Sequence, residues 1–458
     1  MIEGLKPYAE YKDSGLPWAS RIPTHWSLVP NRAVLKRRKV LVGEQHRDYK
    51  LLSLTKKGLV VRDISTGKGK FSSDLGTSQE VRKGDLVFCL FDIPETPRTV
   101  GLSAHDGMIT SAYTVFESTK LTKNGVRYLE KFYLALDDQK LMSPLYSGLR
   151  NTIAPPRFLG TKTPLPPPDE QAAIVRFLDH ANRKIDRFIR VKRKLIGLLN
   201  EQKQAIVHRA VTRGLDPNVA LKPSGFAWLG DIPAHWEAVR CGTLFREVVD
   251  IGHSNATLLS IDRFKGIIPQ CDTGRRTRAS NDRGAYKRVK PGQFAYNLMN
   301  AFMGALGFSQ YDGIISPAYA VAQPLQVIDT NYFHFLFRTS SYTGEFNRLS
   351  YGIMYERNRL YFDRFKLVRA LLPPLGEQKT IAEWINANTG ELTTAITRTE
   401  REIALMQEYR TRLTSDIVTG KLDVREAAAG LPELGEEAGI ESDIPVEFEE
   451  PEAEETDA

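Results

Sequence analysis

Residues 165–216 read LPPPDEQAAIVRFLDHANRKIDRFIRVKRKLIGLLNEQKQAIVHRAVTRGLD, and residues 372–423, 207 positions later, read LPPLGEQKTIAEWINANTGELTTAITRTEREIALMQEYRTRLTSDIVTGKLD. The two stretches align without a gap and share a Leu-Pro-Pro opening, the Glu-Gln pair that follows it and a Val-Thr pair near the end. A match of this length at one fixed offset is an internal repeat. The rest of the chain is therefore organised around two copies of one segment.

Each copy predicts one long helix. Prolines come before the first turn, Asp169 or Gly376 occupies the predicted N-cap, and Gly214 and Gly420 lie where glycines end helices. Apolar residues recur every seven positions, in the same register in both copies, which is typical of a coiled coil. The predicted seam consists of Leu178, Ile185, Ile189, Ile196, Leu199 and Ile206 in the first copy and of Ile385, Leu392, Ile396, Ile403, Met406 and Leu413 in the second.

The link that follows the first long helix constrains the arrangement. A helix of about 40 residues is roughly 60 Å long at ~1.5 Å per residue, whereas the link from Gly214 to Ser224, about ten residues, spans at most ~36 Å. The second globular domain is therefore expected near the far end of the first helix. We expect an antiparallel coiled coil with one globular domain at each end, related by a pseudo-twofold axis.

A shorter repeat, at an offset of 210, precedes each globular domain. Its prolines and tryptophans predict an irregular, tightly packed lead-in segment. Because no acid or nucleophile accompanies His25 or His235, packing is favoured over catalysis. The repeat consists of Ser14, Gly15, Trp18, Ile22, Pro23, His25 and Trp26 in the first copy and of Ser224, Gly225, Trp228, Ile232, Pro233, His235 and Trp236 in the second.

The two regions between lead-in segment and long helix resemble each other much less. They share mainly an Asp-Gly pair (106–107 and 312–313) and an Ala-Tyr pair (112–113 and 318–319). Apolar runs such as LVFCLF, YTVF and YAVA, separated by Gly, Pro and Asp turns, predict mixed α/β domains with substantial sheet. The predicted order is lead-in segment 1–26, domain 27–164, long helix 165–216, lead-in segment 217–236, domain 237–371, long helix 372–424 and acidic tail 425–458.

Charge is distributed unevenly along the chain. The net charge is +8, but residues 431–458 hold 12 acidic and no basic residues, so the rest carries 63 basic against 43 acidic side chains, a net +20. A body this basic favours a polyanionic partner, although many soluble proteins are mildly basic without one. The acidic tail is predicted to be disordered.

The cysteines and the apolar stretches indicate the cellular compartment. Cys89, Cys241 and Cys271 show neither metal-ligand spacing nor an obvious pairing, which fits a reducing cytosol. The N-terminus lacks the apolar core of a signal peptide, and no stretch is long and apolar enough to span a membrane. A cytoplasmic protein without membrane contact is expected.

No catalytic constellation is recognisable, so a non-enzymatic role is predicted. The GKGKF stretch at 67–71 lacks the spacing of a phosphate-binding loop and the Ser or Thr that should follow. Basic stretches interleaved with glycine and aromatic residues are better candidates, because arginine can bind guanine edges and both cations neutralise phosphates. For any single residue a solvated face is the commoner explanation. The DNA-contact candidates are Lys56, Lys57, Arg62, Lys68, Lys70, Arg98 and Arg150 in the first domain and Arg263, Lys265, Arg275, Arg276, Arg278, Arg283, Lys287, Arg288, Tyr355, Arg357 and Arg359 in the second.

The SG..W...IP.HW lead-in segments, the LPP..EQ helix openings at Leu165 and Leu372, the VT.GLD-like helix ends and the Asp-Gly and Ala-Tyr pairs together resemble the specificity (S) subunit of type I restriction-modification systems. The resemblance covers roughly residues 11–424. It implies two target recognition domains that each read one half of a split site on double-stranded DNA. It also implies that the paired helices act as a spacer and dock modification (methyltransferase) subunits, two of them.

The same resemblance implies where the chemistry resides. The modification subunits bring S-adenosylmethionine, and restriction subunits add ATP- and Mg-dependent translocation and cleavage, so no cofactor and no catalytic residue is implied for this chain. The acidic tail is a departure from the family pattern.

Two other functions are compatible with parts of the sequence. A single-chain restriction-modification enzyme would need methyltransferase and nuclease motifs, which the sequence lacks. A coiled-coil adaptor that binds proteins and not DNA would bind independently of salt, whereas phosphate contacts give a steep salt dependence.

Overall fold

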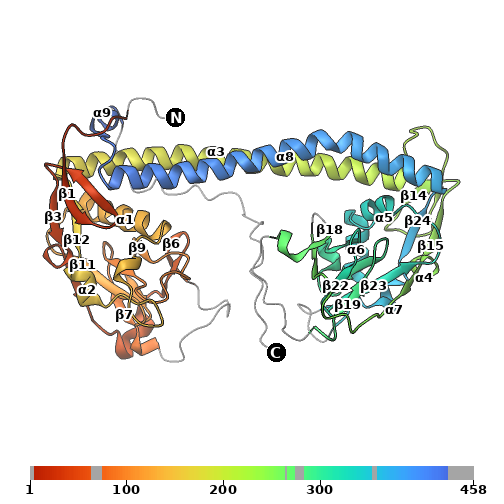
Figure 1. The fold of residues 1–458 in the computed structure, drawn as a ribbon, viewed down its shortest axis with the longest axis horizontal. Coiled ribbons are helices and arrows are strands. Elements are labelled where there is room, and N and C mark those ends of the chain that lie inside the picture. The colour runs from red at the N-terminus through yellow and green to blue at the C-terminus, as the bar shows by residue number, and fades with distance from the viewer. Residues whose placement is uncertain (1–4, 63–74, 264–265, 274–282, 353–357, 432–458) are drawn as a thin grey trace. The chain divides into compact units, whose positions relative to one another are not determined.

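The computed structural model describes residues 5–62, 75–263, 266–273, 283–352 and 358–431. The chain forms two compact units: unit 1 comprises Met1–Val191 and Glu402–Ala458, and unit 2 comprises Lys192–Arg401. The unit boundary passes through both long helices, α3 (Pro168–Arg213) and α8 (Leu375–Val418). Each unit therefore holds one globular domain, the first part of the helix that follows it and the last part of the other helix (Figure 1).

The two long helices are confirmed, with a small correction at their starts. Both begin one residue before the predicted N-cap, so Asp169 and Gly376 lie in the first turn. In α3 the first residue is Pro168, whose fixed φ and missing N–H suit that position. Gly214 and Gly420 follow the helices with φ of 73° and 79°, the left-handed region that glycine adopts most easily.

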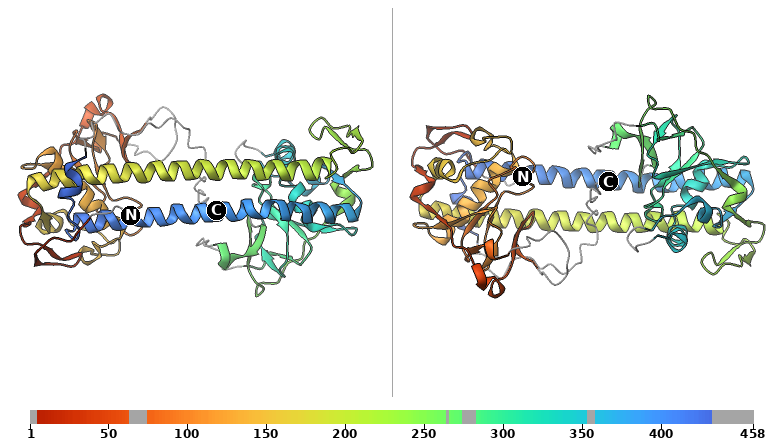
Figure 2. Two further views of the ribbon diagram at one scale, coloured as in Figure 1. Left: turned by 90° about the horizontal axis from the view of Figure 1, so that it is seen from above. Right: turned by 90° about the horizontal axis from the view of Figure 1, so that it is seen from below.

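The residues of the predicted seam are shielded from solvent. All twelve seam residues are buried or half-buried, whereas Val191, Leu198 and Leu405 on the same helices are exposed. Thr399, where the apolar pattern is interrupted, is buried, and its hydroxyl donates a hydrogen bond to the Ala395 carbonyl at 2.7 Å. Within each unit the two helices lie side by side in all the views (Figure 2).

The globular domain of unit 1 is built on a four-stranded antiparallel sheet in the order β4-β11-β8-β9. Two-stranded ribbons, β5–β6 and β7–β10, adjoin it, and β3 pairs with β12 where the chain enters and leaves the domain. The strands are β3 (Ser27–Pro30), β4 (Leu35–Arg38), β5 (Leu52–Thr55), β6 (Gly58–Val61), β7 (Gln79–Val81), β8 (Leu86–Phe88), β9 (Val100–Leu102), β10 (Gly107–Ile109), β11 (Thr114–Ser118) and β12 (Lys162–Leu165). The helices are α1 (Lys123–Asp138), α2 (Pro155–Gly160) and the 3-10 turns η1 (Asn31–Ala33), η2 (Gly43–Asp48), η3 (Leu75–Thr77) and η4 (Ser143–Leu145).

The globular domain of unit 2 repeats this topology. Its sheet has the order β16-β23-β20-β21, its ribbons are β17–β18 and β19–β22, and β15 pairs with β24. The strands are β15 (Glu237–Arg240), β16 (Phe245–Glu247), β17 (Leu259–Asp262), β18 (Gly266–Pro269), β19 (Lys287–Val289), β20 (Phe294–Asn297), β21 (Leu306–Phe308), β22 (Gly313–Ile315), β23 (Tyr319–Pro324) and β24 (Arg369–Leu372). The helices are α4 (Cys241–Leu244), α5 (Thr330–Leu336), α6 (Ser340–Leu349), α7 (Phe362–Phe365) and the 3-10 turns η5 (Gln270–Thr273) and η6 (Ala301–Met303).

A buried tyrosine attaches each domain to both long helices. In unit 1 the Tyr128 hydroxyl lies 3.0 Å from the Pro164 carbonyl of β12 and 3.0 Å from the Val418 carbonyl, the last of α8. In unit 2 the Tyr332 hydroxyl lies within hydrogen-bond distance of the Leu371 carbonyl of β24 and of a carbonyl in the last turn of α3. The end of one helix thus lies beside the start of the other within each unit, so the helices pair antiparallel.

The lead-in segments form hairpins, β1 (Tyr11–Leu16) with β2 (Ala19–Pro23) in unit 1 and β13 (Leu221–Pro223) with β14 (Asp231–Pro233) in unit 2. His25 contacts the carboxylate of Glu170 at 2.8 Å, and the Trp26 indole N–H donates to the same carboxylate at 2.8 Å. His235 and Glu377 repeat the histidine contact at 2.8 Å. The glutamate of the repeated Glu-Gln pair therefore binds the lead-in segment. The expectation that no acid accompanies His25 or His235 was wrong, because each partner glutamate lies more than 140 residues away in the sequence.

Residues 425–431, assigned to the acidic tail from the sequence, contain the short helix α9 (Arg425–Ala429). The chain is ordered here because Val424 and Ala428 are buried in the core of unit 1 and the Arg425 guanidinium lies 5.4 Å from the centre of the Tyr8 ring. The two chain segments also meet directly, since the Asp423 N–H donates to the Lys6 carbonyl at 2.8 Å. The remainder of the predicted tail, from residue 432, lies outside the described residues.

Candidate nucleic-acid interface

Several predicted DNA-contact residues bond to their own domain. Arg150 pairs with Asp92, and the resulting hydrogen bond lowers the pKa of that carboxyl group. Arg288 binds Asp312 through two N–H donors, each at 2.8 Å, which lowers the pKa of Asp312 in the same way. Lys287 is half-buried and donates to a backbone carbonyl at 2.7 Å, and its burial lowers its pKa. Each of these cations therefore has a partner within its own domain.

Other predicted residues are exposed or half-buried. Lys56 and Lys57 are exposed at the tip of the β5–β6 hairpin, and Arg263 is exposed at the tip of the β17–β18 hairpin. Arg359 is exposed, and Arg62 and Arg283 are half-buried. Eight predicted residues lie outside the described parts of the chain: Lys68, Lys70, Lys265, Arg275, Arg276, Arg278, Tyr355 and Arg357.

The two exposed hairpin tips occupy equivalent places in their domains. Each hairpin begins with a parallel bridge to the opposite ribbon, Leu51 to Met108 in unit 1 and Leu258 to Ile314 in unit 2. The second strand of each hairpin lies beside the last strand of the main sheet, β6 beside β9 and β18 beside β21. The structure therefore brings Lys56 and Lys57 to the same position in the fold as Arg263, although their sequences do not align.

The Asp-Gly pair common to both domains lies at the base of these hairpins. A Cβ added to Gly107 would meet the Lys50 carbonyl oxygen at 2.5 Å, and Gly313 faces the Thr257 carbonyl in the same way. Glycine is therefore required where the β10 and β22 strands cross close to the hairpin backbone. The pair supports the hairpins, which explains why it recurs in two otherwise divergent domains.

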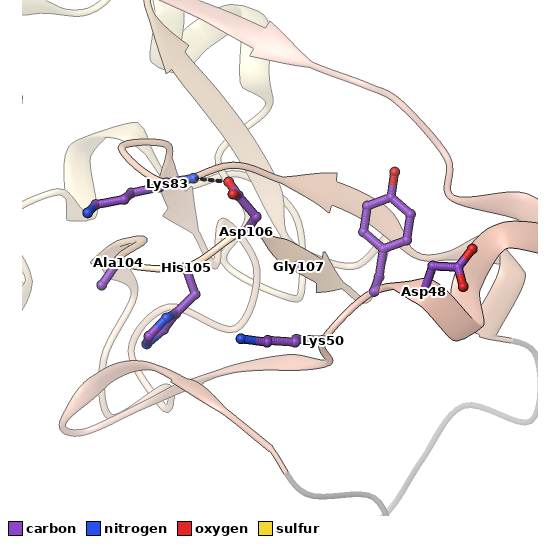
Figure 3. Close-up of a pocket in the computed structure, with 8 residues that line it drawn as sticks. Asp48, Lys50, Lys83, Ala104, His105, Asp106 and Gly107 are labelled. Carbon is purple, nitrogen blue, oxygen red and sulfur yellow. Dashed lines mark hydrogen bonds between the residues drawn. The ribbon is translucent and has the colours of Figure 1, made fainter.

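A hollow of about 450 Å³ lies beside the start of β10 in unit 1 (Figure 3). Lys50, Lys83 and His105 line it together with Asp48 and Asp106. The Asp106 carboxylate accepts a hydrogen bond from the Lys83 backbone N–H at 2.8 Å. Because two carboxylates offset the two lysines, the hollow offers little net attraction to a phosphate. Sequence reasoning did not find it, since its lining comes from three separate stretches.

Two arginines beneath the hairpin tips have roles that the sequence did not reveal. Arg98, whose predicted DNA contact stays a prediction, donates to three groups of its own domain, among them the Lys56 carbonyl. Arg338, absent from the predicted set, donates to the Leu306 carbonyl at 2.7 Å and to the Asp262 carbonyl at 3.4 Å. Only spacing in the folded structure relates these arginines to the tips, so no local sequence signal identifies them.

The described residues contain no cluster of three or more His, Cys, Asp or Glu side chains placed to bind a metal ion. Cys89 and Cys241 are buried as free thiols and Cys271 is exposed. Among the described helices, none has the length and apolarity needed to cross a membrane.

The fold matches solved structures, whereas no protein-family model and no curated protein matches the chain. One match is a chain from a structure of complex assembly and conformational transition in the type I R-M system, with a TM-score of 0.55, 13% identity and coverage of 87% of this chain and 98% of that one. At this identity the match concerns the fold: two globular domains with two long helices.

Two further structures match with lower scores. The HsdS subunit from Thermoanaerobacter tengcongensis has a TM-score of 0.39 at 13% identity, covering 87% of this chain and 98% of that subunit. The type I restriction-modification S subunit from M. genitalium has a TM-score of 0.33 at 10% identity, covering 90% and 97%.

Proposed function

We propose that this chain is the DNA-recognition subunit of a type I restriction-modification complex and that each globular domain reads one half of a bipartite site. The observation that carries the proposal is a duplicated domain with a constant frame and divergent exposed residues, in a fold similar to a chain of a type I R-M system. A protein with two identical DNA-binding domains would bind two copies of the same DNA sequence. Two different surfaces on one frame suit two different half-sites.

The contacts that recur in both units support a shared frame that carries different recognition surfaces. The contacts of Tyr128 with the end of one long helix are repeated by Tyr332 in the other unit. The contact between His25 and Glu170 is likewise repeated by His235 and Glu377. The exposed hairpin tips differ, with two adjacent lysines in unit 1 and Arg263 in unit 2. Side chains read the base edges, and the shared backbone only sets the positions from which those side chains extend.

The proposed partners are double-stranded DNA, modification subunits and restriction subunits. The long helices expose apolar side chains in each unit, Val191 and Leu405 in unit 1 and Leu195 and Leu198 in unit 2, and docked subunits would cover such side chains. We assign S-adenosylmethionine, ATP and Mg to the partner subunits, so this chain contributes recognition and not catalysis.

Methylation mapping tests the proposal. The chain is produced with its modification subunit, and single-molecule sequencing of host DNA returns both halves of the methylated site and their separation. Residues 27–164 are then exchanged for the corresponding domain of another such subunit. We expect one half-site to change and the other half-site and the spacing to stay constant. Methylation that ignores the exchange, or that changes in both halves, would contradict the proposal.

Salt dependence separates this function from the alternative of a protein-binding adaptor. Phosphate contacts release counterions, so the logarithm of the DNA association constant should fall steeply with the logarithm of the salt concentration. An adaptor would bind its protein partner with little dependence on salt and would not bind the mapped site. Binding of S-adenosylmethionine by the purified chain alone would favour a single-chain enzyme.

A further inference from the structure

In unit 1 the Arg98 guanidinium connects three structural elements. Its Nη1 donates to the Lys56 carbonyl at the hairpin tip at 3.2 Å, and its Nε donates to the Val100 carbonyl of β9 at 2.8 Å. Its Nη2 donates to the Glu130 carboxylate of α1 at 3.4 Å. The side chain is only 19% exposed, so these bonds are largely shielded from water. Arg98 therefore joins the tip to the sheet and to a helix.

The hairpin tip has internal support as well. The Thr55 hydroxyl donates to the Gly58 carbonyl at 3.0 Å and accepts from the Lys57 backbone N–H at 3.2 Å. Gly58 has a φ of 109°, and a Cβ at this position would lie 3.7 Å from Nη2 of Arg98. The tip backbone is thus held on both sides, and Lys56 and Lys57 are exposed.

Unit 2 achieves the same support with different residues. Arg338, just after α5, donates through Nη2 to the Leu306 carbonyl of β21 and to the Asp262 carbonyl at the β17–β18 tip. Its Nη1 donates to His334 Nε2 at 2.7 Å, so a histidine of α5 takes the place of the acid. A Cβ on Gly266, the glycine that follows the tip, would lie 3.8 Å from Nη2 of Arg338.

We propose that Arg98 and Arg338 are positioning residues for DNA recognition, because each holds a backbone carbonyl, that of Lys56 or of Asp262, beside exposed basic side chains. In this proposal, which rests on the proposed function, Lys56 and Lys57 contact DNA in unit 1 and Arg263 contacts DNA in unit 2. A tip that is ordered before binding loses less conformational freedom on the DNA, so its contacts contribute more to affinity.

The test is a double-mutant cycle in the complete complex with its modification subunits. The variants are Arg98→Gln, the pair Lys56→Ala and Lys57→Ala, and the combination of all three. Dissociation constants are measured for the mapped site and for DNA with the first half-site scrambled, across a range of salt concentrations. Additivity is expected for independent groups, and its failure measures the coupling between groups that act together.

We expect the lysine pair to weaken binding to the mapped site at least tenfold and to reduce the salt slope by about two, since each phosphate contact contributes about one. Arg98→Gln alone should weaken binding about three- to tenfold, and it should add nothing once Lys56 and Lys57 are replaced. An Arg98→Gln effect of equal size in both backgrounds would overturn the positioning role.

Arg98→Lys distinguishes positioning from a direct DNA contact by Arg98. Lysine keeps the charge but cannot bond three carbonyl and carboxylate acceptors in the fork geometry of a guanidinium. Positioning predicts that Arg98→Lys behaves like Arg98→Gln, whereas a direct phosphate contact predicts near-normal affinity and salt slope. If Arg98→Gln lowers the unfolding temperature strongly, Glu130→Gln supplies a milder loosening of the same bond and should show the same lack of additivity.

Two controls make the outcome specific. Lys162→Ala removes an exposed lysine of β12, away from the hairpin, and should leave the affinity unchanged. Arg338→Gln should weaken binding through the second half-site only. Unchanged affinity and unchanged salt slope after replacement of Lys56 and Lys57 would overturn the inference alone, whereas a complex that does not distinguish the mapped site from scrambled DNA would overturn the proposed function too.

Discussion

Replacing Tyr128 by phenylalanine tests how a globular domain is attached to the long helices. The substitution keeps the ring, which is fully buried and packs edge-on against Trp26 at 6.3 Å between ring centres. It removes only the hydroxyl, which lies 3.0 Å from both the Pro164 and the Val418 carbonyls. Val418 is the last residue of α8, so its carbonyl has no donor within the helix.

The magnitude follows from these two acceptors. A phenol donates one hydrogen bond, and losing it in a buried site while acceptors stay behind costs about 1–3 kcal/mol. In a unit of about 250 residues each kcal/mol lowers the midpoint of thermal unfolding by ~2–4 °C. Tyr128→Phe should therefore lower it by about 4–8 °C for a central cost of about 2 kcal/mol. Burial raises the pKa of Tyr128 well above its ordinary value, so the difference should be the same at pH 6 and pH 9.

The assay is differential scanning calorimetry of the full chain with a matched control. The Tyr146 hydroxyl is buried in the same unit and has no hydrogen-bond partner among the described residues, so Tyr146→Phe should change stability little. Tyr332→Phe removes the equivalent hydroxyl from unit 2, and its effect should add to that of Tyr128→Phe because the sites are independent. Equal, small shifts for Tyr128→Phe and Tyr146→Phe would refute the reasoning.

Three further substitutions test the seam, the glycine at the hairpin base and a buried histidine. Leu199→Asp places a charge in the seam and should cost several kcal/mol in thermal unfolding, whereas Leu198→Asp, at a position 53% exposed, should cost little. Gly107→Ala should cost about 1–3 kcal/mol and lower the midpoint of urea unfolding, because the added Cβ would meet a backbone carbonyl. Gly160→Ala is the control, since a Cβ there would meet open space. Burial and then a nearby arginine lower the pKa of His334 from 6.5 to about 3, so the unfolded chain binds a proton that the folded one does not. The free energy of unfolding should therefore fall as the pH is lowered from about 6.5 to about 3, by up to ~1.4 kcal/mol per pH unit. His334→Gln should remove this contribution from the dependence of stability on pH.

The long helices could be predicted closely because their signals are local. The seven-residue apolar period, the prolines at the starts and the glycines at the ends all act within a few residues of the feature that they predict. Mixed α/β domains also followed from short apolar runs, and the run at 86–91 does contain β8. The matching sheet orders of the two domains could not be predicted, because strands such as β4 and β11 pair across more than 70 residues.

For the candidate interface, the sequence predicted only which basic residues could contribute, and not their partners or their positions in the fold. Basic residues stand out in a sequence, but their partners do not: Arg98 bonds to Glu130, 32 residues away, and Arg288 bonds to Asp312, 24 residues away. Both arginines therefore looked like available cations. Lys56 and Lys57 were proposed from their charge alone, and their place at the turn of the β5–β6 hairpin comes from the structure.

If the hairpin tips contact DNA as proposed, the support beneath them allows recognition to change without loss of the fold. Arg98 and Arg338 bond to backbone carbonyls at the tips, and a carbonyl is present whatever side chain the residue carries. Replacing Lys56 and Lys57 by serine should therefore change DNA affinity while altering the free energy of unfolding by less than about 0.5 kcal/mol, as for ordinary surface substitutions. Urea unfolding of the free chain measures this, with Gly58→Ala as a contrast that strains the tip backbone itself. A large loss of stability in the serine variant would show that the tip side chains belong to the frame.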